Sequence, residues 1–317
     1  WRERALGARF TLRALIRLLR GRRRYDVIHA HQLYSPTLIG AVVKSLTGAP
    51  LVVRVTAAGE GVGEVDELAR LPFARLRRWA LGKIDVVIAQ TELAREELIG
   101  AGIAPERVRI VPSAVELPAE PLPQPRTGDG PYRLLYAGRF SEEKGLDTAV
   151  EALALLRDAG RDVRLRLVGR PDPDRDATPR LRELARTLAV EDRVEWAGFT
   201  DALPDEHAAA DAFLLPSRSE GMSNALLEAA AAGMVCIASD IPQNRAVTGD
   251  DGARYFGPGD ARALAEVVAD LDADRERGGA GSRALASAAR GRVSAAHTPD
   301  RVAARLAEIY AEVTADA

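Results

Sequence analysis

The chain has 317 residues, of which 47% are apolar and 28% charged, and its formal net charge is −2. This composition is typical of a globular protein with room for two domains, and it excludes a disordered or fibrous chain. No apolar run reaches the roughly 18 residues that a membrane-spanning helix needs. Residues 1–120 hold 19 Lys and Arg against 13 Asp and Glu. We therefore expect the basic first part and the acidic remainder to meet different ligands or surfaces.

The first predicted element is an amphipathic helix over residues 3–20, and more arginines follow it up to residue 24. Its apolar positions fall near one face, and arginines fill much of the rest. One interpretation is a surface helix that packs on a sheet. The other is a basic collar, residues 3–24, that makes peripheral contact with an anionic membrane or an anionic acceptor. Aromatic residues do not alternate with the arginines, so nucleic acid is not a predicted partner.

Strands and helices then alternate through the first half of the chain. Apolar segments predict strands over residues 26–30, 50–55, 84–89 and 108–111. Helices are predicted over residues 36–47, 71–82 and 92–100, the last with Thr91 as its N-cap. A segment rich in proline follows and predicts a linker. We expect an N-terminal domain over residues 1–117 and the linker over residues 118–131.

A second alternating set predicts a C-terminal domain over residues 132–296. Its predicted strands are residues 133–136, 163–168, 194–196, 213–215, 235–238 and 254–256. Its predicted helices are residues 145–159, 178–188, 224–232 and 260–271, and a last helix begins after Thr298 with Pro299 in its first turn. Apolar strands that alternate with helices indicate parallel sheets covered by helices. The predicted fold class is therefore α/β, with two doubly wound, Rossmann-like domains.

The single cysteine, Cys236, lies in an apolar run that predicts a buried strand. A lone buried cysteine favours a reducing, cytoplasmic location and argues against a nucleophilic role. His207 and His297 have no partners at metal-ligand spacing. No cluster of His, Cys and Asp predicts a metal site.

The most informative stretch runs from Pro216 to Glu228 and contains a second glutamate, Glu220. A buried strand precedes it, and a helix that ends at Gly233 follows. The turn between them leaves backbone N–H groups free at a helix N-terminus, where a pyrophosphate can bind. Two carboxylates flanking such a site could accept hydrogen bonds from the hydroxyl groups of a nucleotide-sugar. The alternative is that Glu220 caps the helix and Glu228 lies on a solvated face.

A second motif, residues 136–145, follows a predicted strand and opens a helix. Gly138 would permit a tight turn there. Arg139 and Lys144 would place two cations at the helix N-terminus, where a diphosphate could dock. The alternative is a local pair between Lys144 and Glu142 or Glu143 on a surface turn.

Two histidines, His29 and His31, lie two apart on one predicted strand and so point to the same face. His31 lies at the carboxyl end of its strand, where open α/β sheets bind ligands. The alternative for His31 is a cap of the following helix, and His29 is expected to pack against a helix. The glycines of residues 58–63 do not have the spacing of a dinucleotide-binding loop.

The Pro216–Glu228 stretch and the 136–145 motif resemble those of the family 4 retaining nucleotide-sugar glycosyltransferases, which have the GT-B fold with a cleft between two Rossmann-like domains. The resemblance implies that Glu228 holds the ribose hydroxyls and that Glu220 and His31 face the transferred sugar. Arg139 and Lys144 would neutralise the leaving nucleoside diphosphate. The remaining implied donor contacts come from Gly138, Gly169, Phe199, Gly221, Met222, Ser223, Asn224 and Leu227.

The function implied by the resemblance is transfer of a sugar from a nucleoside diphosphate to an acceptor hydroxyl, with the anomeric configuration retained. Glu220, His31, Arg139 and Lys144 would be the catalytic residues. The donor is a substrate, and neither a cofactor nor a metal ion is expected. The acceptor would be a glycan, a glycolipid or another lipid-linked or small molecule. The resemblance also implies that residues 297–317 pack back on the first domain and that residues 58–63 form a mobile loop on the acceptor side.

The chain departs from the family pattern at its start. Family members usually begin with a strand and a glycine-rich loop, whereas here one helix precedes the strand at residues 26–30. The first domain is therefore expected to be N-terminally incomplete. This leaves open a nucleotide-sugar-binding fragment with impaired catalysis, and a GT-B nucleotide-sugar epimerase as a third alternative.

Overall fold

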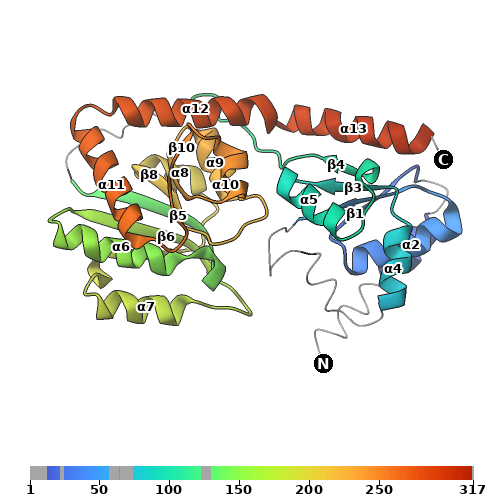
Figure 1. The fold of residues 1–317 in the computed structure, drawn as a ribbon, viewed down its shortest axis with the longest axis horizontal. Helices are drawn as coiled ribbons and strands as arrows, with labels where there is room; N and C mark the ends of the chain where they lie inside the picture. Colours follow the sequence, from blue (N-terminus) through green and yellow to red (C-terminus); the bar gives the residue numbers. More distant parts are fainter. Residues whose placement is uncertain (1–12, 22–24, 57–63, 65–73, 123–129, 316–317) are drawn as a thin grey trace. The chain divides into compact units, whose positions relative to one another are not determined.

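The computed structural model describes residues 13–21, 25–56, 64, 74–122 and 130–315. The chain divides into two compact units, residues 1–113 with 300–317, and residues 114–299. Both units have a parallel sheet covered by helices, which confirms the predicted α/β class (Figure 1).

Within its described residues, the sheet of the first unit has four parallel strands in the order β1-β2-β3-β4. They are β1 (Ile28–His31), β2 (Leu51–Arg54), β3 (Val86–Ala89) and β4 (Val108–Ile110). Its connections hold α2 (Ser35–Thr47), α4 (Ala74–Gly82), α5 (Glu92–Gly100) and the 3-10 helix η1 (Pro105–Arg107). Thr91 caps α5 as predicted, because its side chain accepts a hydrogen bond from the N–H of Ala94.

Both faces of this sheet are covered, because successive side chains of a strand point to opposite faces. On one face, Leu51 and Val53 pack with buried residues of α2 and α5. On the other face, Val52 and Ile88 pack with Ile309 of the last helix, α13 (Pro299–Ala315). The last helix of the chain therefore completes the core of the first unit.

In the part of the second unit that the structure describes, the sheet has six parallel strands in the order β10-β9-β8-β5-β6-β7. They are β5 (Tyr132–Phe140), β6 (Val163–Pro171), β7 (Val194–Gly198), β8 (Ala212–Leu215), β9 (Val235–Ser239) and β10 (Ala253–Phe256). The order reverses between β5 and β8, which is where open α/β sheets bind their ligands.

Helices cover both faces of the second sheet. On one face lie α6 (Leu146–Asp158), α7 (Thr178–Thr187) and α11 (Ala261–Glu276). On the other lie α8 (Leu203–Ala209), α9 (Asn224–Ala232), α10 (Pro242–Thr248) and α12 (Ala280–Ala296). Figure 1 shows α6 and α7 on one side of this sheet and α9 and α12 on the other. Two 3-10 turns, η2 (Glu142–Lys144) and η3 (Glu191–Arg193), complete the unit.

The structure corrects the sequence analysis in two respects. The strands β5 and β6 are longer than predicted, so Gly138 and Arg139 lie inside β5 instead of in a turn. Gly138 pairs with Gly169 of β6, and a Cβ atom on Gly169 would overlap the carbonyl oxygen of Gly138. The helices α8, α10 and α12 were not predicted, because α8 and α10 have only seven residues each and α12 has a weakly patterned sequence rich in Ala, Gly and Ser.

Several predictions lie wholly or partly outside the described residues. The loop at residues 58–63 lies wholly outside them, and the helix predicted over residues 71–82 and the linker at residues 118–131 lie partly outside. The same holds for the helix predicted over residues 3–20, which the structure describes as helical over residues 13–20. Membrane contact through residues 3–24 stays a prediction. Among the helices that the structure describes, none is long and apolar enough to cross a membrane.

Candidate active site

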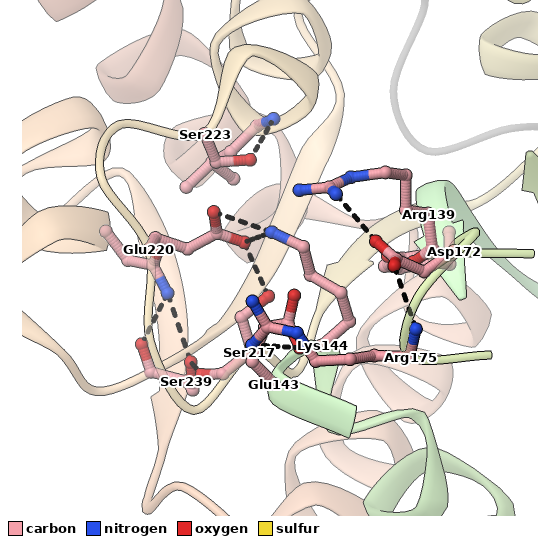
Figure 2. A network of polar contacts seen from close by, with 12 residues as sticks. Arg139, Glu143, Lys144, Asp172, Arg175, Ser217, Glu220, Ser223 and Ser239 are labelled. Carbon is pink, nitrogen blue, oxygen red and sulfur yellow. Dashed lines mark hydrogen bonds and ion pairs between the residues drawn. The ribbon is translucent and has the colours of Figure 1, made fainter. Parts of the chain in front are cut away.

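The candidate site lies at the carboxyl edge of the second sheet, where consecutive segments bring charged side chains together. Lys144 follows β5, Asp172 follows β6 and Glu220 follows β8. Because parallel strands all end at the same edge, residues far apart in sequence meet there. Figure 2 shows Lys144 and Glu220 pointing toward one another, with Arg139 turned toward Asp172.

Lys144 and Glu220 form the central ion pair of this edge. The Nζ atom of Lys144 lies 2.9 Å from both carboxylate oxygens of Glu220. The two side chains are 15% and 8% exposed. The local pair of Lys144 with Glu142 or Glu143, which the sequence left open, is therefore not the arrangement that the structure has. The contact joins the two motifs that the sequence analysis singled out.

Arg139 is held by an acid that sequence reasoning missed. Its Nη1 atom donates to Oδ2 of Asp172 at 2.6 Å, although the Arg139 side chain is 63% exposed. The other oxygen of Asp172 accepts from the backbone N–H groups of Asp174 and Arg175. Burial acts to raise the pKa of Asp172, but these two N–H groups and the nearby guanidinium of Arg139 outweigh it, and the net pKa is lowered. A stable carboxylate thus orients one nitrogen of Arg139 and leaves its other donors open.

The N-terminus of α9 lies beside the Lys144–Glu220 pair. Ser223 is its N-cap, and the Ser223 side chain accepts from the N–H of Leu226 at 3.2 Å. Glu220 is therefore not the N-cap of α9, which excludes the alternative that its role is to cap this helix. Gly221 and Met222 form the half-buried turn before the helix, and Asn224 is its exposed first residue. The positive end of the helix dipole and its first N–H groups favour an anion at this place.

The chain is similar to proteins of a known family. The sequence profile described as "Glycosyl transferases group 1" matches residues 131–274, and that described as "Glycosyl transferase 4-like domain" matches residues 1–114. The chain is 32% identical over 282 residues to D-inositol 3-phosphate glycosyltransferase 1 of Catenulispora acidiphila, which covers 82% of this chain and 67% of that relative. The chain therefore belongs to the glycosyltransferase family that these two profiles and this relative represent.

Other similar proteins have related names. The chain is 31% identical over 244 residues to the 2-deoxystreptamine glucosyltransferase of Streptomyces kanamyceticus, a match that covers 69% of this chain and 61% of that relative. It spans about three fifths of the length of the first two curated relatives that it matches. Among solved structures, HepE of Anabaena in complex with UDP superposes with a TM-score of 0.78 at 19% identity, over 94% of this chain and 82% of that one. This similarity confirms the predicted GT-B fold.

Glu228 lies just over one turn into α9, next to the buried Leu227. Glu228 is exposed, as in the solvated-face alternative, and forms no ion pair with another residue that the structure describes. Partial desolvation by its neighbours nevertheless raises its pKa. Glu228 lies at the wall of a pocket of about 280 Å³ between α8, α9 and the segment that leads into the second unit. His207 lines the same pocket, and burial lowers its pKa to about 4, with Glu206 acting in the opposite direction. Glu228, in the middle of α9, and Ala232, at its end, both line this pocket.

The ends of β6 and β7 carry the remaining predicted donor contacts. Gly138 and Gly169 let the backbones of β5 and β6 approach closely, because a Cβ atom on Gly169 would overlap the carbonyl oxygen of Gly138. Phe199, directly after β7, is 54% exposed. The guanidinium carbon of Arg170 lies 3.9 Å from the centre of its ring. An exposed aromatic ring with a cation above it offers a stacking surface for a planar ligand.

His31 belongs to the first unit, which the structure describes apart from the second. It is the exposed last residue of β1, and its ring stacks on that of His29 with centroids 4.7 Å apart. His29 Nδ1 lies 2.6 Å from the hydroxyl of Tyr310 in α13. Burial, then His31 and Arg54, lower the pKa of His29 to about 4. His29 therefore packs against a helix, and the neutral ring of His29 fixes the plane of His31.

Other residues of the site gave no clear sequence signal. Ser217 donates from Oγ to Oε1 of Glu220 at 2.6 Å, and it is fully buried. Serines are common in turns, so its role depends on a partner that only the fold supplies. Among the residues that the structure describes, no group of three or more His, Cys, Asp and Glu could hold a metal ion.

Proposed function

We propose that this chain transfers a sugar from a nucleoside diphosphate to an acceptor hydroxyl, with retention of the anomeric configuration. The observation that carries the proposal is the contact of Lys144 with Glu220, because it brings a cation for a diphosphate and an acid for a sugar to one place. Arg139 and the N-terminus of α9 lie at the same sheet edge.

The diphosphate would bind to Arg139, Lys144 and the backbone from Gly221 to Asn224. Breaking the bond from the sugar to the diphosphate leaves negative charge on the departing oxygen. Fixed cations and helix N–H groups stabilise that charge without reorganisation, and such groups are worth roughly 10² to 10³ in rate each. Two side-chain cations at the leaving group supply the charge that a metal ion supplies in other transferases.

The nucleoside would extend from the diphosphate, at the N-terminus of α9, along this helix toward Glu228. Glu228 would accept hydrogen bonds from the ribose hydroxyls, and Gly169 and Phe199 would border the base. The similar HepE structures include complexes with UDP and with UDP-glucose. UDP is therefore the first nucleotide to test.

Retention is proposed without a protein nucleophile. Glu220 already accepts hydrogen bonds from Lys144 and Ser217, so it suits a hydroxyl-binding role better than attack on the sugar. The acceptor oxygen would attack from the face that the diphosphate leaves. The bond from sugar to diphosphate breaks, the bond from sugar to acceptor forms, and the diphosphate takes the acceptor's proton. His31 would contact the transferred sugar, and the acceptor would be a sugar or a lipid-linked molecule.

Calorimetry with UDP, GDP, ADP and dTDP tests the donor site directly. We expect one of these nucleotides to bind the chain and to lose its affinity in the Glu228→Ala variant. Thermal unfolding of the variant controls for its fold. If none of the four binds the unaltered chain, the proposed donor site is wrong.

A further inference from the structure

Three fully buried polar residues connect the helix α10 to Glu220. Asn244 donates from Nδ2 to the carbonyl oxygen of Ser239 at 2.9 Å and to its Oγ at 3.1 Å. The hydroxyl of Ser239 donates in turn to the carbonyl oxygen of Ser217. Ser217 then donates from Oγ to Oε1 of Glu220 at 2.6 Å. Figure 2 shows Ser217 and Ser239 below Glu220 in this network.

The direction of this chain of hydrogen bonds is fixed. The Nδ2 group of an asparagine can only donate, so the Ser239 oxygen accepts from Asn244 and its proton must point to the carbonyl of Ser217. Asn244, Ser239 and Ser217 have no exposed surface. A buried hydroxyl that loses its partner costs free energy, which opposes any other arrangement.

The segment at Ser217 is also held from its other side. The N–H of Arg218 donates to the carbonyl oxygen of Glu143 at 2.8 Å. Gly145 approaches Pro216 so closely that a Cβ atom there would overlap the Pro216 carbonyl oxygen. The backbone that carries Ser217 is therefore clamped between the end of β9 and the turn η2.

The contacts that Glu220 makes leave a defined part of its carboxylate available as a hydrogen-bond acceptor. An ionised carboxylate has about four acceptor positions. Lys144 contacts both oxygens and Ser217 contacts Oε1, so the free position is on Oε2. One hydroxyl group can be bound there in a fixed direction.

We infer that Asn244, Ser239 and Ser217 are positioning residues that orient Glu220 toward one hydroxyl of the transferred sugar. This inference rests on the proposed function, and it assigns to the chain of hydrogen bonds a share of the affinity for the sugar. The nucleoside diphosphate, which meets other groups, gains nothing from it. The measurable quantity is the sugar increment, which is the ratio of the dissociation constant of the nucleoside diphosphate to that of its sugar derivative.

The test is calorimetry with four pairs of probes: UDP and UDP-glucose, GDP and GDP-mannose, ADP and ADP-glucose, dTDP and dTDP-glucose. We expect Ser217→Ala to lower the sugar increment about tenfold, the size of one hydrogen bond to a charged group. Affinity for the diphosphate alone should stay within about twofold. Ser217→Thr, which keeps the hydroxyl, should retain the increment.

Ser282→Ala is the matched control, because it also removes a buried hydroxyl that donates to a carboxylate, Oδ2 of Asp274 at 2.7 Å. It should leave the sugar increment unchanged. In a Glu220→Gln background, Ser217→Ala should not lower the sugar increment any further. Ser217 acts through the carboxylate of Glu220, and this background lacks that carboxylate. Ser239→Ala gives the same comparison if Ser217→Ala does not fold.

Four results would overturn the inference. They are an unaltered chain without a sugar increment, a folded Ser217→Ala variant with its increment intact, an equal loss for diphosphate and sugar derivative, and an undiminished loss in the Glu220→Gln background. Failure of all four nucleotides to bind the unaltered chain would instead overturn the proposed function, and the positioning role with it.

Discussion

The ammonium of Lys144 lies 2.9 Å from both carboxylate oxygens of Glu220, although 76 residues separate them in the sequence. Both side chains are largely buried. Breaking a buried ion pair by removing one partner is costly, since the other charge stays behind without compensation. The same contact therefore supports the fold of the second unit and the chemistry proposed for it.

Replacing Lys144 should separate these two roles. We expect Lys144→Met to lower the rate of sugar transfer by roughly 10² to 10³ and the free energy of unfolding by about 3 kcal/mol. The double variant Lys144→Met with Glu220→Gln should recover most of the stability, because no buried charge is left, but not the rate. Release of nucleoside diphosphate and denaturant unfolding measure the two effects. A double variant with the unaltered rate would show that Lys144 does not stabilise the leaving group.

Glu228 should make nucleotide binding depend on pH. Burial raises the pKa of Glu228 above the ordinary value of 4.5. The ionised form is needed to accept two ribose hydroxyls, so affinity for the nucleotide should fall as the pH drops through this raised pKa. Above it, Glu228→Gln should bind about tenfold more weakly, as for the loss of a hydrogen bond to a charged group. Calorimetry from pH 8 to pH 4.5 with both proteins separates this titration from that of the diphosphate itself. Parallel curves for the two proteins would contradict the assignment.

Phe199 should contribute to binding of the base. Its exposed ring lies under the guanidinium of Arg170, and stacking of a base on an aromatic side chain is worth about 1 to 3 kcal/mol. We expect Phe199→Ala to weaken binding of the nucleotide by about tenfold or more. Inorganic pyrophosphate has no base and serves as the control ligand. Equal weakening for pyrophosphate would mean that the substitution disturbs the diphosphate site instead.

Gly145 should tolerate no side chain. Its φ is +62°, and a Cβ atom would overlap the carbonyl oxygen of Pro216. Gly160 has a similar φ of +73°, but no atom lies within 4 Å of its Cβ position. Gly160→Ala should therefore cost only the backbone strain, about 1 to 2 kcal/mol. Gly145→Ala should cost a further 1 to 3 kcal/mol or so from overpacking. Denaturant unfolding of both variants gives the difference, and equal losses would show that the approach to Pro216 is unimportant.

The sequence predicted best the features that depend on neighbouring residues. The helix over residues 224–232 has the predicted bounds, because its N-cap Ser223 and the left-handed Gly233 at its end are local signals. Thr91 caps α5 for the same reason. The lengths of β5 and β6 were underestimated, because the residues around Gly138 extend the strand only when Gly169 pairs with them.

The candidate site shows the same difference between features encoded by neighbouring residues and contacts made by the fold. The α/β class and the candidate residues Lys144, Glu220 and Glu228 follow from the sequence, since their motifs are continuous stretches of chain. The pairing of Lys144 with Glu220, and not with Glu142 or Glu143, emerges only when the chain is folded. Folding also brings Asp172 to Arg139, and Asn244 and Ser239 to the turn that carries Ser217. The physical reason is that caps and periodic faces are encoded within a few residues, whereas the partners of a buried polar side chain are set by which strands lie next to one another.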